Sequence, residues 1–95
     1  MREKTIEQSL VTETRRRKGW ALKFVSPGCV GVPDRLILMP KGRAGFVELK
    51  APGKKPRLIQ KRRISQLRAL GCKVYVVDDA EQIAAVLDDI GGEDG

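Results

Sequence analysis

Residues 34–50 read Asp-Arg-Leu-Ile-Leu-Met-Pro-Lys-Gly-Arg-Ala-Gly-Phe-Val-Glu-Leu-Lys, and this stretch decides the fold. It holds two apolar runs, residues 35–39 and 46–50, each with the length and composition of a β-strand. The segment between them, residues 40–45, contains one proline and two glycines, which favour a reversal of the chain. The pattern therefore predicts a β-hairpin.

Three polar side chains lie on one face of this hairpin. Because successive side chains of a strand point to opposite faces, Glu48 and Lys50 point the same way. A turn centred near Gly42 puts Asp34 opposite Lys50 and diagonal to Glu48, still on that face. We expect the two carboxylates to lie within reach of one metal ion, on condition that this register holds.

Outside the hairpin, the periodicity predicts three helices and two further strands. The helices span residues 3–18, 58–70 and 80–90, the last capped by Asp79, and the strands span residues 20–25 and 73–77. The order α-β-β-β-α-β-α predicts an α/β fold with a mixed central sheet flanked by helices. We expect one domain over residues 1–95, a frayed tail over residues 91–95, and Trp20, Phe24 and Phe46 in the core.

The charge is distributed unevenly along the chain. All 19 Lys and Arg residues lie in residues 1–77 together with only five acids, which gives that segment a net charge of +14. A segment this basic favours a polyanionic partner, and nucleic acid is the usual one. A solvated basic surface is the alternative, and we expect the acidic stretch from Asp78 onward to face away from bound DNA.

Composition excludes several classes of protein. The chain has no histidine, which removes Ser-His-Asp and Cys-His catalysis and zinc sites that require imidazole. Cys29 and Cys72 are far apart without a C-x-x-C motif, so we interpret both as reduced thiols of a cytosolic protein. The sequence contains no run of about 18 apolar residues, so we expect no membrane span. No apolar segment follows the first residues, so we expect no secretory signal.

Two further polar residues occupy apolar stripes. Taken singly, Asp34 fits a loop cap, and Glu48 with Lys50 fits a surface ion pair. However, Glu7 lies on the inward stripe of the first helix and Gln60 heads the inward stripe of the second. We expect both to point at the sheet face that carries the two hairpin carboxylates.

Oxygen ligands of this kind suit Mg²⁺, which keeps several waters. Asp34, Glu48 and the backbone carbonyl of Leu49 would form half of its coordination shell, with Mn²⁺ as a substitute. Such an ion lowers the pKa of a bound water and offsets charge that builds on a phosphate. Lys50 could orient the attacking water or stabilise that charge.

The ordered motifs resemble one known family. The segments Gly31-Val32-Pro33-Asp34-Arg35, Glu48-Leu49-Lys50, Pro56–Gln60 and Gly71–Asp78 are similar to those of the virus-type replication–repair nucleases, the VRR-NUC branch of the PD-(D/E)xK superfamily. The resemblance covers residues 7–87 and implies a restriction-endonuclease-like αβββαβ(α) core. It implies that Asp34 and Glu48 bind the metal and that Lys50 is the catalytic lysine. It also implies that Glu7 supports the metal or its waters, and that Gln60 holds the site or the phosphate. The chain resembles stand-alone phage members of the family, which implies a homodimer that cuts branched DNA such as four-way junctions.

Basic residues near these motifs are candidates for DNA contact. They are Lys54, Lys55 and Arg57 in the loop after the Glu48 strand, Lys61 on the second predicted helix, and Arg15, Arg16 and Arg17 at the end of the first. For the last three, a favourable interaction with the helix dipole is an equally good interpretation.

The sequence leaves two alternatives to a metal-dependent DNA endonuclease. One is a basic nucleic-acid-binding module without catalysis, and the other is a nuclease-like subunit of a larger replication or repair machine. The first explains the basic charge but not the acids on apolar stripes.

Overall fold

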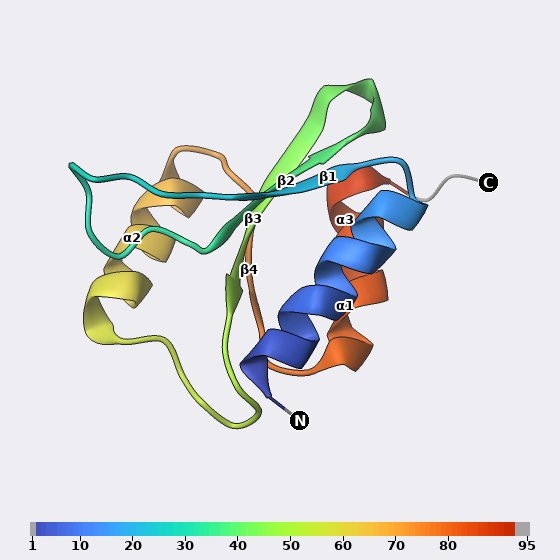
Figure 1. Cartoon of the computed structure of the whole chain (residues 1–95). Helices are drawn as coiled ribbons and strands as arrows, with labels where there is room; N and C mark the ends of the chain where they lie inside the picture. The colour runs from blue at the N-terminus through green and yellow to red at the C-terminus, as the bar shows by residue number, and fades with distance from the viewer. Residues whose placement is uncertain (1, 93–95) are drawn as a thin grey trace.

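The computed structural model describes residues 2–92 as three helices, two short 3₁₀ turns and a four-stranded sheet. The elements in chain order are α1 (Glu3–Arg16), β1 (Trp20–Lys23), β2 (Arg35–Met39), η1 (Pro40–Gly42), β3 (Arg43–Leu49), α2 (Leu58–Ala69), β4 (Val74–Val77), η2 (Ala80–Gln82) and α3 (Ile83–Gly91). This order confirms the predicted α/β fold, and Figure 1 shows the sheet between helices on either side.

The sheet has the strand order β1-β2-β3-β4 and is mixed. The β1–β2 and β2–β3 pairs are antiparallel, and β4 joins parallel to β3 after the α2 crossover. The predicted hairpin is confirmed, but its predicted register is shifted by two residues. Arg35 pairs with Val47, so Asp34 falls opposite Glu48 rather than opposite Lys50. An even shift keeps every side chain on its predicted face.

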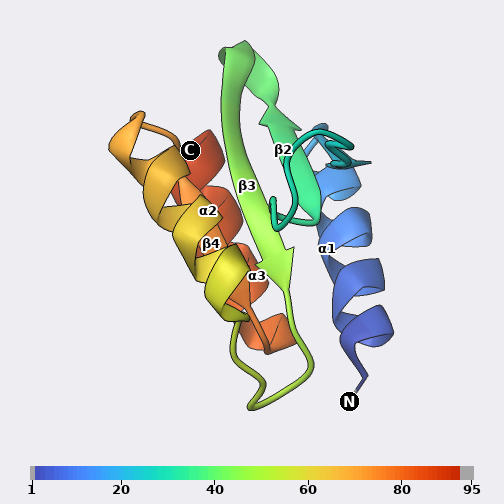
Figure 2. The same ribbon diagram turned by 90° about the vertical axis from the view of Figure 1, so that its left-hand side faces the viewer.

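The helices cover the two faces of the sheet unequally. Helices α1 and α3 pack on one face, where they enclose the core, whereas α2 lies on the other face over β3 and β4 (Figure 2). The core consists of Ile6, Leu10, Ile37, Met39, Val47, Leu49, Val77, Ile83, Leu87 and Ile90. The α2 face of β1 and β2 has no helix over it among the described residues.

Three expectations from the sequence are wrong at this level. Trp20 is 68% exposed rather than in the core, because it lies on the sheet face that α2 leaves uncovered. The expected last helix begins instead as a 3₁₀ turn, although the Asp79 carboxylate accepts a hydrogen bond from the Glu81 N–H as the cap predicts. Gly91 is no frayed tail: it ends α3, is buried, and leaves no room for a Cβ beside Met39. Gly92, the next residue of the predicted tail, is the C-cap of α3, and residues 93–95 lie outside the described residues.

Candidate active site

The site forms where the hairpin ends, at the carboxyl end of β3. Its central side chain is Glu48, which is only 1% exposed although it is a carboxylate. The side chain points away from the α1–α3 core, toward α2, because its neighbours Val47 and Leu49 fill that core. A buried acid is costly unless it is paired, so the contacts of Glu48 decide what the site can do.

One oxygen of Glu48 is held by two donors, and the other is left open. Gln60 Nε2 donates to Glu48 Oε2 at 2.7 Å, and Lys50 Nζ lies 3.4 Å from the same oxygen. Within residues 2–92, nothing donates a hydrogen bond to the buried Oε1. Burial and then the nearby charge of Asp34 raise the pKa of Glu48 to about 7, although Lys50 works in the opposite direction.

The first turn of α2 fixes the orientation of Gln60. Its Oε1 accepts the backbone N–H of Arg57 at 2.8 Å, which satisfies a donor that the helix start leaves free. The amide therefore presents Nε2, its donor group, to Glu48. The sequence prediction that Gln60 faces inward is confirmed, since its side chain is buried.

Asp34 lies beside Glu48 and is tied to the end of β3. Its Oδ2 accepts a hydrogen bond from the backbone N–H of Leu49 at 2.9 Å. This contact lies just beyond Arg35–Val47, the last β2–β3 pair. The N–H and C=O of one strand residue point to the same edge, so the Leu49 carbonyl faces the side on which Asp34 lies. Asp34 and Glu48 are therefore neighbours at the end of the hairpin, and the charge of Asp34 is felt by Glu48.

Glu7 occupies a different place from the one predicted. Its carboxylate pairs with Arg35, with Nη2 at 3.0 Å and Nε at 3.2 Å from Oε2, and Arg35 also donates to the Ala21 carbonyl at 2.8 Å. Arg35 is on the α1 face of β2, so the prediction that Glu7 points at the sheet face of Glu48 is wrong. The reason is helix rotation: Ile6, the adjacent position, takes the buried place on α1.

The acid of α1 whose charge reaches the site is Glu3, which the sequence analysis did not single out. Its charge contributes to the raised pKa of Glu48. Glu3 lies one turn before Glu7 on the same stripe of α1, so the helical spacing could have identified it as a candidate. Among residues 2–92, no group of three or more acidic or thiol side chains is arranged to hold a metal ion. Any metal site here therefore needs backbone and water oxygens as well.

The predicted basic residues divide into two groups. Lys54, Lys55 and Arg57 are exposed in the loop that leaves β3 at the site, and Lys61 is exposed on α2. By contrast, Arg15, Arg16 and Arg17 lie at the other end of α1, about 20 Å along the helix from its first turn. The two groups cannot contact the same phosphate.

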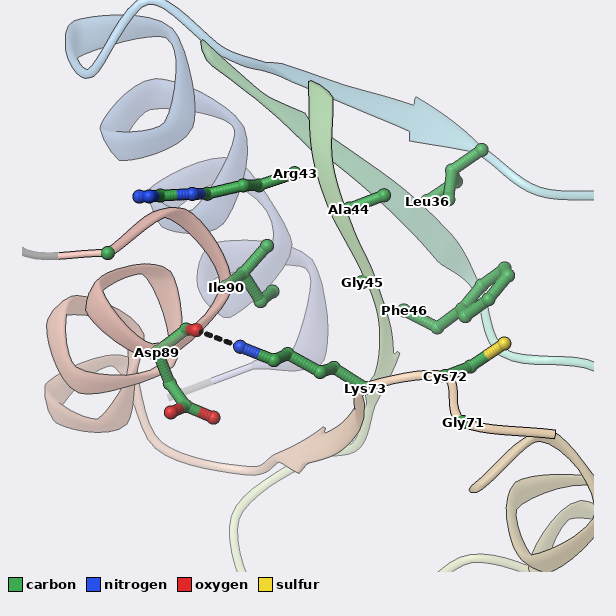
Figure 3. Close-up of a pocket in the computed structure, with 11 residues that line it drawn as sticks. Leu36, Arg43, Ala44, Gly45, Phe46, Gly71, Cys72, Lys73, Asp89 and Ile90 are labelled. Atoms are coloured by element: carbon green, nitrogen blue, oxygen red, sulfur yellow. Dashed lines mark hydrogen bonds between the residues drawn. The ribbon is translucent and has the colours of Figure 1, made fainter. Parts of the chain in front are cut away.

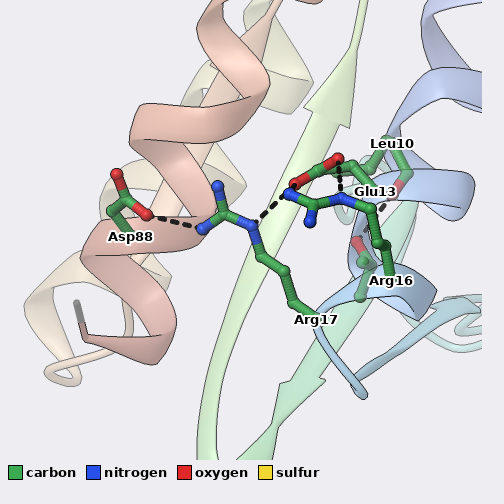
Figure 4. A network of polar contacts seen from close by, with 6 residues as sticks. Leu10, Glu13, Arg16, Arg17 and Asp88 are labelled. Carbon is green, nitrogen blue, oxygen red and sulfur yellow. Dashed lines mark hydrogen bonds and ion pairs between the residues drawn. The ribbon is translucent and has the colours of Figure 1, made fainter. Parts of the chain in front are cut away.

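Arg16 and Arg17 are also engaged by acids (Figure 4). Arg16 Nη2 lies 2.5 Å and Arg17 Nε 2.9 Å from Glu13 Oε2, and Arg17 Nη1 lies 2.5 Å from Asp88. Hydrogen bonds from Arg16 and Arg17 lower the pKa of Glu13 to about 2. This network joins α1 to α3, which favours a structural role for Arg16 and Arg17 at the end of α1.

The acidic stretch does not gather on a remote face as expected. Asp78 follows β4 directly, and β4 runs parallel to β3, so Asp78 lies at the same end of the sheet as Glu48. Asp88 lies near the opposite end, on Arg17.

Both cysteines, Cys29 and Cys72, are free, which agrees with the reduced thiols that we expected. None of the helices in the described part of the chain has both the length and the apolar character needed to span a membrane.

The loop that leads into Asp34 is anchored on α2. Phe24 N–H donates to the Asp34 carbonyl at 2.8 Å, and Arg63 Nε donates to the Val30 carbonyl at 2.7 Å. Gly31, with φ of +89°, sits against Ile59, where a Cβ would come within 2.9 Å of its side chain. Only glycine accepts this conformation and contact without strain, so Gly31 holds the loop before Asp34 against α2.

Comparison with known proteins agrees with this geometry. No family model matches the chain. The chain is 49% identical over 87 residues to "Putative nuclease p44" of Acyrthosiphon pisum secondary endosymbiont phage 1, covering 92% of each protein. A solved structure described as "VRR_NUC domain" superimposes with a TM-score of 0.84 and 28% identity, covering 90% of this chain and 94% of that one. With an identity this high over nearly the whole length, and the fold and the Asp34–Glu48–Lys50 arrangement in place, the chain belongs to the VRR-NUC family of nucleases.

Proposed function

We propose that this nuclease is a metal-dependent endonuclease that hydrolyses phosphodiester bonds in DNA, with Mg²⁺ held by Asp34, Glu48 and the Leu49 carbonyl. The observation that carries the proposal is the buried Oε1 of Glu48, which lies beside a second carboxylate and has no hydrogen-bond donor among residues 2–92. A divalent cation would satisfy that oxygen and the charge of both acids at once. The donor set, all oxygen, suits Mg²⁺ and also Mn²⁺.

When bound, such a cation would lower the pKa of a water molecule and offset the negative charge that builds on the phosphate. The chain's own residues prepare the site. Gln60, locked by the Arg57 N–H, holds Glu48 in one orientation. Lys50, with its Nζ 3.4 Å from Glu48, is available to donate to a phosphate oxygen or to orient the attacking water.

The substrate proposal rests on the exposed cations at the catalytic end. Lys54, Lys55, Arg57 and Lys61 flank the site and would bind the DNA backbone on either side of the cut. We also propose that the enzyme prefers branched DNA, such as four-way junctions, and that it acts as a homodimer that makes paired cuts, as the resemblance to stand-alone phage members implies. The engagement of Arg16 and Arg17 with acids removes them from the proposed DNA contacts.

A cleavage assay tests the proposal. Labelled four-way junction and linear duplex would be incubated with the wild-type protein in Mg²⁺, in Mn²⁺ and in EDTA. We expect cleavage with either cation and none in EDTA, and we expect Glu48→Gln to bind DNA without cutting it. Glu13→Gln, a change at the far end of α1, is the matched control and should cut normally.

Two outcomes would contradict the proposal. Undiminished cleavage in EDTA would remove the metal, and binding without cleavage by the wild-type protein under every condition would favour a non-catalytic nucleic-acid-binding module. Equal rates on junction and duplex would remove only the preference for branched DNA.

A further inference from the structure

Two segments of the chain flank the carboxylates of the site, and they differ in charge. Residues 24–33 lead from β1 into Asp34 and contain no charged residue, in a chain of which 33% is charged. Residues 50–57 lead away from Glu48 and contain cations but no acid, namely Lys50, Lys54, Lys55 and Arg57. The second segment suits the DNA backbone, whereas the chemistry of the first does not.

The uncharged segment carries exposed apolar side chains at its tip. Val25 is 76% and Val30 68% exposed, and Pro27 between them is exposed as well. The Cys29 N–H donates to the Ser26 carbonyl at 3.1 Å, so the chain makes a turn whose ends lie within about 7 Å of each other. Val25 and Val30 flank this turn, and we call Val25, Pro27 and Val30 the apolar loop tip. Exposed apolar side chains that adjoin one another mark interaction surfaces, whereas single ones are ordinary.

The apolar loop tip is presented on a fixed support. Arg63 of α2 donates to the Val30 carbonyl at 2.7 Å. Gly31 packs against Ile59 of α2, so the loop lies alongside this helix (Figure 1). A loop that is held in one conformation before its ligand arrives loses little entropy on binding, which favours specific recognition.

A hollow of about 550 Å³ offers a contrast to the loop (Figure 3). It lies beside residues 43–46, the first half of β3, whereas the catalytic carboxylates lie at the end of that strand. Both cations that line it are engaged with the end of α3: Lys73 Nζ donates to the Asp89 carbonyl at 2.6 Å, and Arg43 donates to the Gly91 carbonyl. The apolar loop tip, which leads directly into Asp34, is therefore the stronger candidate for contact with the substrate.

The chemistry of the apolar loop tip matches bases rather than phosphates. Proteins bind the DNA backbone with cations, which the tip lacks. Proteins that kink or part DNA instead insert apolar side chains, proline among them, between bases that lose their stacking partner. The bases of a linear duplex are stacked inside the helix, whereas a branch exposes bases where the strands part. The tip therefore has a partner on branched DNA that a linear duplex does not offer.

We propose that the loop between β1 and β2 recognises the branch in branched DNA, with Val25, Pro27 and Val30 packed against bases that the branch leaves unstacked. The cations of residues 50–57 would hold the phosphates of the same substrate. Val30 precedes Asp34 by four residues, a span of at most about 14 Å that corresponds to about four base-pair steps. The cut would therefore fall within about four nucleotides of the branch. The inference rests on the proposed function and names the residues behind its preference for branched DNA.

Binding without cleavage tests the proposal. A four-way junction and a linear duplex of equal length would be titrated with the full chain in EDTA, with 2-aminopurine beside the branch to report unstacking. The wild type should bind the junction more tightly than the duplex and change the 2-aminopurine emission. Val25→Ser/Val30→Ser should lose roughly tenfold in junction affinity, as removal of one base contact does. Its duplex affinity should stay within about twofold of the wild type, because no cation has changed.

Both valines are exposed, so the double variant should keep the Tm of the wild type. Val30→Ser alone should lose less junction affinity and guards against misfolding of the double variant.

Leu70→Ser is the matched control. Leu70 is 80% exposed at the end of α2, beyond the part of the helix that the loop contacts, so its variant should keep both affinities. Replacing both Lys54 and Lys55 with Ala should weaken the two complexes to a similar extent, because both substrates present phosphates.

Three results would overturn the proposal. The first is a wild type that binds junction and duplex equally, and the second is a Val25→Ser/Val30→Ser protein that keeps the full junction preference. The third is a dimer that this double substitution splits in sedimentation velocity, which would assign the apolar loop tip to a contact with a second copy of the chain. Because no step measures cleavage, these results stand apart from those of the cleavage assay for the proposed function.

Discussion

The buried carboxylate of Glu48 makes the metal-free protein less stable at high pH, and the size of the effect follows from the structure. Burial raises the pKa of Glu48 from its ordinary value of 4.5 to about 7. Between these values the folded chain binds more protons than the unfolded chain, so the free energy of unfolding falls as the pH rises. The contribution is fully present below pH 4.5 and lost above about pH 7.

The magnitude comes from the difference between the two pKa values of Glu48. At 1.36 kcal/mol per pH unit, the rise from 4.5 to about 7 corresponds to about 3 kcal/mol of stability lost on deprotonation. For a domain of this size that amounts to a Tm decrease on the order of 10–20 °C. Glu48→Gln cannot ionise, and its amide oxygen can still accept from Gln60 Nε2, so this loss should disappear in the variant.

Denaturant unfolding of both proteins in EDTA at pH 5 and pH 8 measures the effect. The wild type should lose about 3 kcal/mol more than Glu48→Gln over this interval, and Mg²⁺ at pH 8 should stabilise the wild type selectively. Glu13→Gln is the control, and it should lose as much stability as the wild type between pH 5 and pH 8. Arg16 and Arg17 lower the pKa of Glu13 to about 2, so its contribution is present above pH 4.5 and is lost as the pH falls toward 2. Equal pH dependence in the wild type and Glu48→Gln would refute the reasoning.

Three further predictions concern the site and its surroundings. Lys50→Ala should slow cleavage about 10²-fold or more with little change in Tm, and a large loss of Tm with normal activity of the folded fraction would contradict this. Gln60→Ala should lower stability by about 1–3 kcal/mol, because it leaves the Arg57 N–H and Glu48 without their partner, as chemical denaturation would show. Replacing both Lys54 and Lys55 with Ala should reduce the salt dependence of duplex binding by about 1.8 in log–log slope, whereas Arg16→Ala should leave that slope unchanged.

The strands, and the placement of Glu48 and Lys50 on one face, could be predicted from the sequence because alternation determines faces without any tertiary information. Glu48 and Lys50 lie on one face whatever the register, and the two-residue shift in pairing keeps Asp34 with them. That shift arises at the turn: β3 already begins at Arg43, immediately after a 3₁₀ turn, whereas the glycine content suggested a longer loop. Turn length depends on local geometry that residue types alone leave open.

The errors occur where a partner distant in sequence decides the outcome. The helical pattern of α1 is compatible with either Ile6 or Glu7 in the buried position, and packing of the helix on the sheet places Ile6 in the core. The engagement of Arg17 depends on Asp88, 71 residues away, which no local pattern reveals. Trp20 alternates like a core residue, and only the position of α2 leaves it uncovered.

The most direct test of the central claim is metal binding without DNA. Mn²⁺ titration followed by electron paramagnetic resonance would compare the wild type with Asp34→Asn, Glu48→Gln and, as the matched acid outside the site, Glu7→Gln. The account predicts that Mn²⁺ binds the wild type and Glu7→Gln, and that either site substitution weakens binding at least tenfold, since each removes a ligand charge. Wild-type affinity in the Asp34→Asn and Glu48→Gln proteins would contradict the assignment of the metal site.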